Sequence, residues 1–159
     1  MGDRSAALAG RFEQAVSDFT KVIDGCSDAQ WQAVCGDEGW SVAVTAQHVA
    51  GQFPLEMEFI TAAAEGKPLP GYSWDDVNGK NDTRAAANTG ASKAGVLATL
   101  RDGSAMVSKY IRGLSDEQLD RAGELPLAGG AKVTTQQLIE GGVLIEHVTG
   151  HMASIKAAG

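Results

Sequence analysis

The chain has 159 residues, which suits one domain with one core, and we expect a single domain over residues 1–159. Thirteen Lys and Arg against twenty Asp and Glu give a net charge of −7, which argues against a nucleic-acid partner because phosphate binding needs a basic face. No stretch approaches the roughly 20 apolar residues of a membrane helix, and no signal-peptide pattern is present, so we expect a cytoplasmic protein without a membrane partner.

Four long segments have the apolar spacing of helices. The first ends at Asp24-Gly25, and its apolar face is formed by Leu8, Phe12, Ala15, Phe19, Val22 and Ile23. The second begins after the N-cap candidate Ser41 and runs to about Glu65. The third begins near Ser92 and ends at Gly113. The fourth begins at Thr134, where a capping box with Gln137 is expected, and continues through the late histidines as one helix. Glycines at 141, 142 and 150 weaken this fourth helix, so packing or a ligand must hold it.

The connections between these segments predict further short helices. Residues 67–92 form a long connection, in which we expect a short helix over about 75–87. The stretches CSDAQWQAV (26–34) and LSDEQLDRA (114–122) resemble each other, and each offers a capping box. No segment shows sustained strand-type alternation. We therefore predict an all-α four-helix bundle of two αα-hairpins with short extra helices in the connections.

The three histidines of the chain are the strongest functional signal. His147 and His151 are four residues apart, so on a helix they point the same way and can share one metal ion. The third ligand can come only from His48, in the first turns of the second helix. Three histidines with one open position is the arrangement of a catalytic zinc site. The alternative is that the histidines are ordinary core residues and that the HxxxH spacing arose by chance.

Other catalytic arrangements find little support. Zinc proteases need Glu directly after the first His, and that position is Val148. Glu146 would point roughly 100° away around the helix, so no general acid or base is assigned and the catalytic residues stay unknown. The two cysteines, Cys26 and Cys35, have eight residues between them, form no CxxC motif, and are interpreted as reduced thiols.

Two of these motifs resemble a known family. The stretch GWSVAVTAQHV (39–49) resembles the start of the second helix of the DinB/YfiT-like superfamily, and IEHVTGHMASI resembles its last helix. The resemblance covers nearly the whole chain and maps the family's three metal histidines onto His48, His147 and His151. It implies a four-helix bundle with one divalent metal ion per chain, often in a homodimer. Some relatives carry a further histidine beside the last ligand, where this chain has Met152.

Three functions stay open at this point. The resemblance implies a metal-dependent transferase or isomerase that uses a low-molecular-weight thiol of the mycothiol or bacillithiol type. The same site would suit a metal-dependent hydrolase, or a non-catalytic dimeric bundle that is stabilised by metal or binds a small molecule. Zinc is the default ion, and nickel, copper or iron would also suit imidazole ligands. Trp40, Tyr72 and Trp74 are candidates for a pocket mouth, although packing roles suit them equally well.

Overall fold

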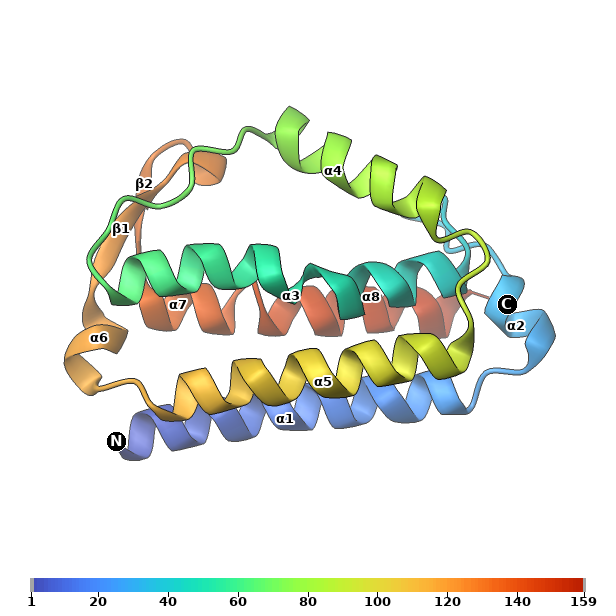
Figure 1. Cartoon of the computed structure of the whole chain (residues 1–159), viewed down its shortest axis with the longest axis horizontal. Coiled ribbons are helices and arrows are strands. Elements are labelled where there is room, and N and C mark those ends of the chain that lie inside the picture. Colours follow the sequence, from blue (N-terminus) through green and yellow to red (C-terminus); the bar gives the residue numbers. More distant parts are fainter. Residues whose placement is uncertain (1, 159) are drawn as a thin grey trace.

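The protein is a bundle of four long helices, described here from a computed structural model that covers residues 2–158 (Figure 1). The long helices are α1 (Asp3–Asp24), α3 (Val42–Ala64), α5 (Lys93–Arg112) and a fourth rod made of α7 (Thr135–Glu140) and α8 (Ile145–Ala157). The predicted all-α bundle is thereby confirmed. Among the helices of the described residues, none is both long and apolar enough to cross a membrane.

Short capped helices occupy the connections, as the sequence predicts. They are α2 (Asp28–Gln32), α4 (Trp74–Ala87) and α6 (Asp116–Asp120). The predicted capping boxes at Ser27 and Ser115 are present, and a third at Ser73 begins α4. In each box the Ser hydroxyl accepts a backbone N–H from the first turn and so satisfies a donor that the helix itself cannot.

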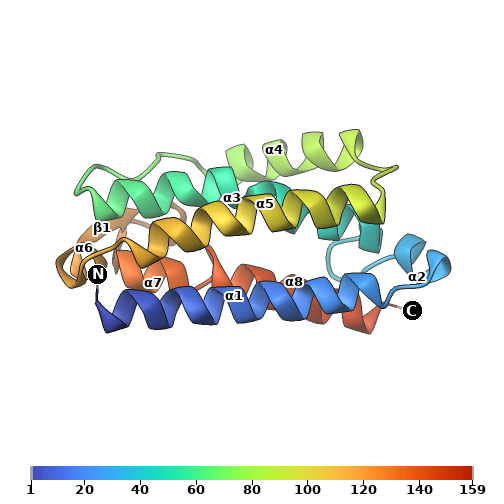
Figure 2. The same ribbon diagram turned by 60° about the horizontal axis from the view of Figure 1, so that its bottom comes forward.

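The order of the long helices around the bundle differs from two αα-hairpins. α1 packs against α5 and α8, and α3 packs against the same two helices, so α1 and α3 lie diagonally across the bundle (Figures 1 and 2). α3 and α5 run in the same direction, because residues 65–92 carry the chain back along the outside of the bundle through α4 (Figure 1). The consecutive helices α1 and α3 run antiparallel, as in an αα-hairpin, but lie on the diagonal instead of packing against each other, which the sequence did not predict.

The core fills the space between the diagonal helices. Phe12 of α1 meets Phe53 of α3 edge-on, with ring centroids 5.6 Å apart. Phe19 and Ile23 continue the same face of α1, and all four side chains are fully buried. The apolar face of α1 that the spacing predicts is thus the face that the structure buries.

A small β-hairpin was not expected from the sequence. β1 (Ala122–Leu125) pairs antiparallel with β2 (Ala131–Thr134), and a 3-10 turn over Pro126–Ala128 lies between them. Gly129 and Gly130 complete the turn with φ of +66° and +84°, which suits residues without a side chain. Strands of four residues are too short for an alternating pattern to be recognised, which is why this hairpin was missed.

The fourth long helix is interrupted, whereas the sequence predicted one continuous helix. α7 ends at Glu140 and α8 begins at Ile145. Gly141 leaves the helical conformation with φ −87° and ψ −158°, and a Cβ there would lie 2.9 Å from the Gln137 carbonyl oxygen. Gly141 and Gly142, which weaken the predicted helix, therefore lie where α7 ends, and α8 begins as a separate helix after them.

A matched pair of glycine substitutions tests how tightly α5 packs on α3. A Cβ added at Gly103 would lie 2.9 Å from the ring of buried Phe53, whereas a Cβ at Gly10 meets no atom within 4 Å. Gly10→Ala should raise the free energy of unfolding by about 0.5–1 kcal/mol, the usual gain in helix propensity. Gly103→Ala should lower it, because overpacking costs about 1–3 kcal/mol and outweighs that gain.

Urea unfolding of both variants beside the parent measures the two effects under one condition. If Gly103→Ala stabilises the protein as much as Gly10→Ala does, the Phe53 ring can move aside and the α3–α5 contact is looser than the structure implies.

Candidate metal centre

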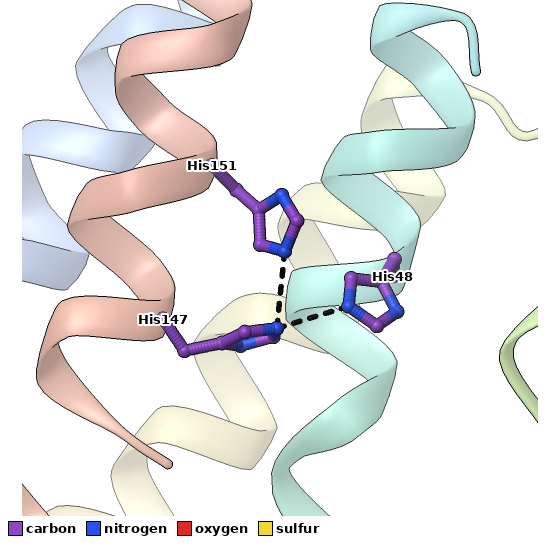
Figure 3. A group of neighbouring side chains, drawn as sticks. All are labelled: His48, His147 and His151. Atoms are coloured by element: carbon purple, nitrogen blue, oxygen red, sulfur yellow. Dashed lines mark hydrogen bonds between the residues drawn. The ribbon is translucent and has the colours of Figure 1, made fainter. Parts of the chain in front are cut away.

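The three predicted histidines meet inside the bundle. His48 comes from α3, and His147 and His151 come from α8, which packs against α3 (Figure 3). The Nε2 atom of His147 lies 2.9 Å from Nε2 of His48 and 3.1 Å from Nε2 of His151. They form a group whose ligand atoms all lie within 4.8 Å of one another.

Two carboxylates stand behind this cluster. Glu38, in the loop before α3, lies with Oε1 2.8 Å from Nδ1 of His151. Glu56 of α3 lies with Oε1 2.7 Å from Nδ1 of His147, although the angle departs from that of a hydrogen bond. A carboxylate beside Nδ1 favours the proton on that nitrogen and leaves Nε2 with its lone pair.

The arrangement fits a bound cation. If Nδ1 of His147 and of His151 carries the proton, the two Nε2 atoms that face each other at 3.1 Å are both acceptors and cannot bond to each other. A positive ion among the three nitrogens would convert this repulsion of lone pairs into three favourable contacts. Three imidazoles suit zinc, and three protein ligands leave one position open.

Burial keeps the histidines in the neutral form that binds metals. Burial lowers the pKa of His48 to about 2, with the neighbouring histidines and Arg84 adding to the effect. Burial also lowers the pKa of His147 to about 4 and lowers the pKa of His151, which Glu38 partly offsets. At neutral pH the imidazoles are therefore uncharged, and an ion does not have to displace a second proton from them.

The histidines form part of the wall of a pocket of about 460 Å³, a volume within the range of small-molecule sites. The other lining residues are mostly apolar and come from α3, α4, the hairpin and the interruption before α8: Gln52, Leu55, Glu56, Phe59, Trp74, Val77, Asn81, Leu125, Leu127, Ala128, Gly142 and Val143. A larger hollow of about 1090 Å³ between α1 and α5 contains none of the histidines. The pocket at the histidine cluster is therefore the candidate site.

Features that the sequence did not predict shape this pocket. The hairpin supplies Leu125 and Leu127, and the interruption of the fourth helix supplies Gly142 and Val143. Trp74 of α4 donates its indole N–H to the Leu127 carbonyl at 2.9 Å, which joins α4 to the hairpin beside the pocket.

The other residues singled out in the sequence lie outside the cluster. Glu146 is exposed, in agreement with its rejection as a general base. Cys26 and Cys35 are both free thiols. Of the three candidate aromatic residues only Trp74 lines the pocket. Trp40 packs against His48, with the two ring centroids 5.2 Å apart.

Sequence reasoning missed Glu38 and Glu56. Glu56 follows His48 by eight residues, a spacing that keeps both on one face of a helix, so it could have been found. Glu38 lies in a loop, where no periodicity indicates the direction of a side chain.

Removing a bound ion should lower the melting temperature while leaving the helices folded below it. An ion present at a concentration of about 100 times its dissociation constant adds about 2.7 kcal/mol to the free energy of unfolding. For a chain of this size, that gain corresponds to a rise in melting temperature of about 5–10 °C. The core around Phe12 and Phe53 does not depend on the ion, so helicity should persist. Thermal scans by circular dichroism with and without a chelator measure both quantities. A chelated protein without helical signal at room temperature would refute a preformed scaffold.

The chain is thus an all-α bundle in which a histidine pair from one helix and a histidine from another form a candidate metal site on the wall of a pocket. The chain belongs to the DinB superfamily, whose model matches residues 11–155. A search of curated protein sequences finds no match.

Solved structures with this fold include proteins described in different terms. YfiT from Bacillus subtilis, described as a probable metal-dependent hydrolase with an unusual four-helix bundle topology, superposes with a TM-score of 0.76 at 18% identity, covering 99% of this chain and 87% of that one. The mycothiol-dependent maleylpyruvate isomerase gives a TM-score of 0.63 at 16% identity, covering 96% of this chain but 57% of that one. An uncharacterized protein from Clostridium difficile 630 gives a TM-score of 0.73 at 11% identity, covering 99% of this chain and 96% of that one. At these identities the likeness shows the fold alone.

Proposed function

We propose that the protein is a metal-dependent transferase or isomerase that acts on a low-molecular-weight thiol. His48, His147 and His151 would hold one divalent ion through Nε2, with zinc as the default. When bound, the ion would offer an open coordination position to a thiol sulfur. It would lower the pKa of that thiol, so that the nucleophilic thiolate forms at neutral pH.

The observation that carries this choice is the scarcity of acids and bases in the pocket. Among the described residues that line it, Glu56 is the only carboxylate, and it lies against His147. Gln52 and Asn81 are neutral amides. Many metal-dependent hydrolases place a general base beside the metal-bound water, whereas a metal-bound thiol with a lowered pKa needs none. The walls of this pocket therefore suit thiol chemistry better.

Two alternatives remain candidates for the same site. The similarity to YfiT supports metal-dependent hydrolysis, because that protein is described as a probable hydrolase. Hydrolysis that uses a general base would require Glu56, the one lining carboxylate among the described residues, to leave His147. A metal-stabilised binding protein without activity would use the same pocket for a small ligand.

The test is the optical spectrum of cobalt-substituted protein. Addition of mycothiol or bacillithiol should produce a sulfur-to-metal charge-transfer band, and the thiol's conjugation to an electrophile should require all three histidines. Chelated protein treated with the same thiols is the control. If carboxylate or phosphate ligands alter the cobalt spectrum and no thiol does, hydrolysis becomes the better proposal.

We also propose that the protein works as a homodimer in the cytoplasm. The dimer is supported by the family resemblance. The two free cysteines agree with a reducing compartment, in which small thiols are kept reduced. Light scattering at several protein concentrations measures the oligomeric state, and a constant monomer mass would exclude the dimer.

A further inference from the structure

The walls of the pocket beyond the histidines are apolar on several sides. Phe59 and Leu55 come from α3, and Val77 and Trp74 come from α4. The hairpin adds Leu127 opposite α4, where its carbonyl holds the indole of Trp74. Trp74 is 59% exposed, so it lies where the pocket opens to solvent.

No Lys or Arg lines this pocket within residues 2–158. The guanidinium of Arg84, on α4, donates to the side-chain Oε1 of Gln52, and Arg84 lines two adjoining hollows rather than this one. Charge near the histidines comes instead from Glu56 and Glu38, which add negative charge when ionised.

An anionic ligand would therefore be poorly accommodated. Apart from the proposed ion, the walls offer a carboxylate no cation to pair with, and a buried charge without a partner is strongly unfavourable. The one coordination position that a bound ion would leave open is taken by the thiol sulfur in the proposed function, so a carboxylate could not bind the ion there. A hydrogen-bond donor on a neutral ligand can still be satisfied, because the acceptor Asn81 Oδ1 is buried and has no partner among the described residues.

From these walls we infer that the second substrate is an uncharged, largely apolar electrophile, such as an aryl halide or an unsaturated ketone, and not a carboxylate. The inference rests on the proposed thiol chemistry for its reaction but on the pocket alone for its selectivity. With an aryl halide, the sulfur forms a bond to the ring carbon, the carbon–halogen bond breaks, the halide leaves with the electron pair, and the thiol proton passes to solvent. With an unsaturated ketone, the sulfur adds to the β-carbon and the thiol proton goes to the α-carbon.

Binding of two unreactive ligands that differ by one charge tests the inference. meta-Dinitrobenzene and dinitrobenzoate share the ring and nitro groups, lack a leaving group, and differ in the carboxylate. Calorimetric titration of metal-loaded protein in the presence of mycothiol should give a dissociation constant at least about tenfold lower for dinitrobenzene. The same titration of chelated protein removes any ion that could hold the carboxylate and should keep the preference.

Two variants sharpen the result. Leu127→Lys places a cation on the pocket wall and should reduce or reverse the preference. Arg84→Gln removes the cation that is hydrogen-bonded to Gln52 without changing a lining residue, and should leave the preference unchanged. Tighter or equal binding of dinitrobenzoate to chelated protein would overturn the inference, as would anion binding that disappears in Arg84→Gln.

Failure of the thiol proposal gives a different pattern. Chlorodinitrobenzene is the reactive counterpart of the neutral ligand. If dinitrobenzene binds selectively but metal-loaded protein does not accelerate the conjugation of any tested thiol to chlorodinitrobenzene, the pocket selectivity stands and the proposed reaction does not.

Discussion

Each of the variants His48→Ala, His147→Ala and His151→Ala should reduce the metal content of the purified protein from close to one divalent ion per chain to a small fraction of that. The three Nε2 atoms face one another across distances of 2.9 and 3.1 Å, so each contributes one of only three ligands. The loss of any one leaves two neutral imidazoles, which form a much weaker site. The chain has no other histidine to replace the missing ligand.

Elemental analysis of protein prepared without a histidine tag measures the metal content directly. Thr149→Ala is a suitable control, because Thr149 lies on α8 between the two histidines and its hydroxyl bonds only to the Glu146 carbonyl. This variant should keep its metal. Full metal content in His48→Ala would mean that the bound ion does not depend on His48 and that the triad is wrong.

The second large effect concerns the carboxylates behind the histidines. Glu38→Gln and Glu56→Gln should each weaken metal affinity by about 10- to 100-fold, the usual range for groups that orient a ligand. Glu38 lies 2.8 Å from Nδ1 of His151, and Glu56 lies 2.7 Å from Nδ1 of His147. The amide keeps the size of the side chain but removes the negative charge that supports a dication.

Burial raises the pKa of Glu56 well above its usual value, and Arg84 offsets this in part. A bound dication would act in the opposite direction and favour the carboxylate, since an opposite charge nearby favours the ionised form. Competition with a chromogenic chelator measures the affinities. Glu58→Gln is the matched control, because Glu58 lies on the same helix but bonds to Tyr72 at the surface. Parent-like affinity in Glu56→Gln would show that this carboxylate does not support the metal site.

The histidine site could be predicted from the sequence because two simple constraints define it. Helical periodicity places His147 and His151 on one face, and the scarcity of histidine leaves His48 as the third ligand. The structure brings these three together as expected. The long helices were predicted for the same reason, since their apolar faces repeat every three to four residues.

The pocket around the site could not be predicted in the same way. Its walls come from a hairpin with four-residue strands, a helix interruption at Gly141 and a connection that returns through α4. Each depends on contacts between segments distant in sequence, which periodicity does not contain. The diagonal position of α1 and α3 is likewise a property of the whole chain path.

That chain path has a consequence for how the protein is made. His48 and His147 are separated by 99 residues, and the site needs α8 in place beside α3. A ribosome-bound chain that has produced α1, α3 and α5 can pack these helices, but it exposes the apolar faces that α8 will cover and presents a single metal ligand. If these histidines bind an ion, its capture therefore comes last in biosynthesis and marks molecules whose bundle is complete.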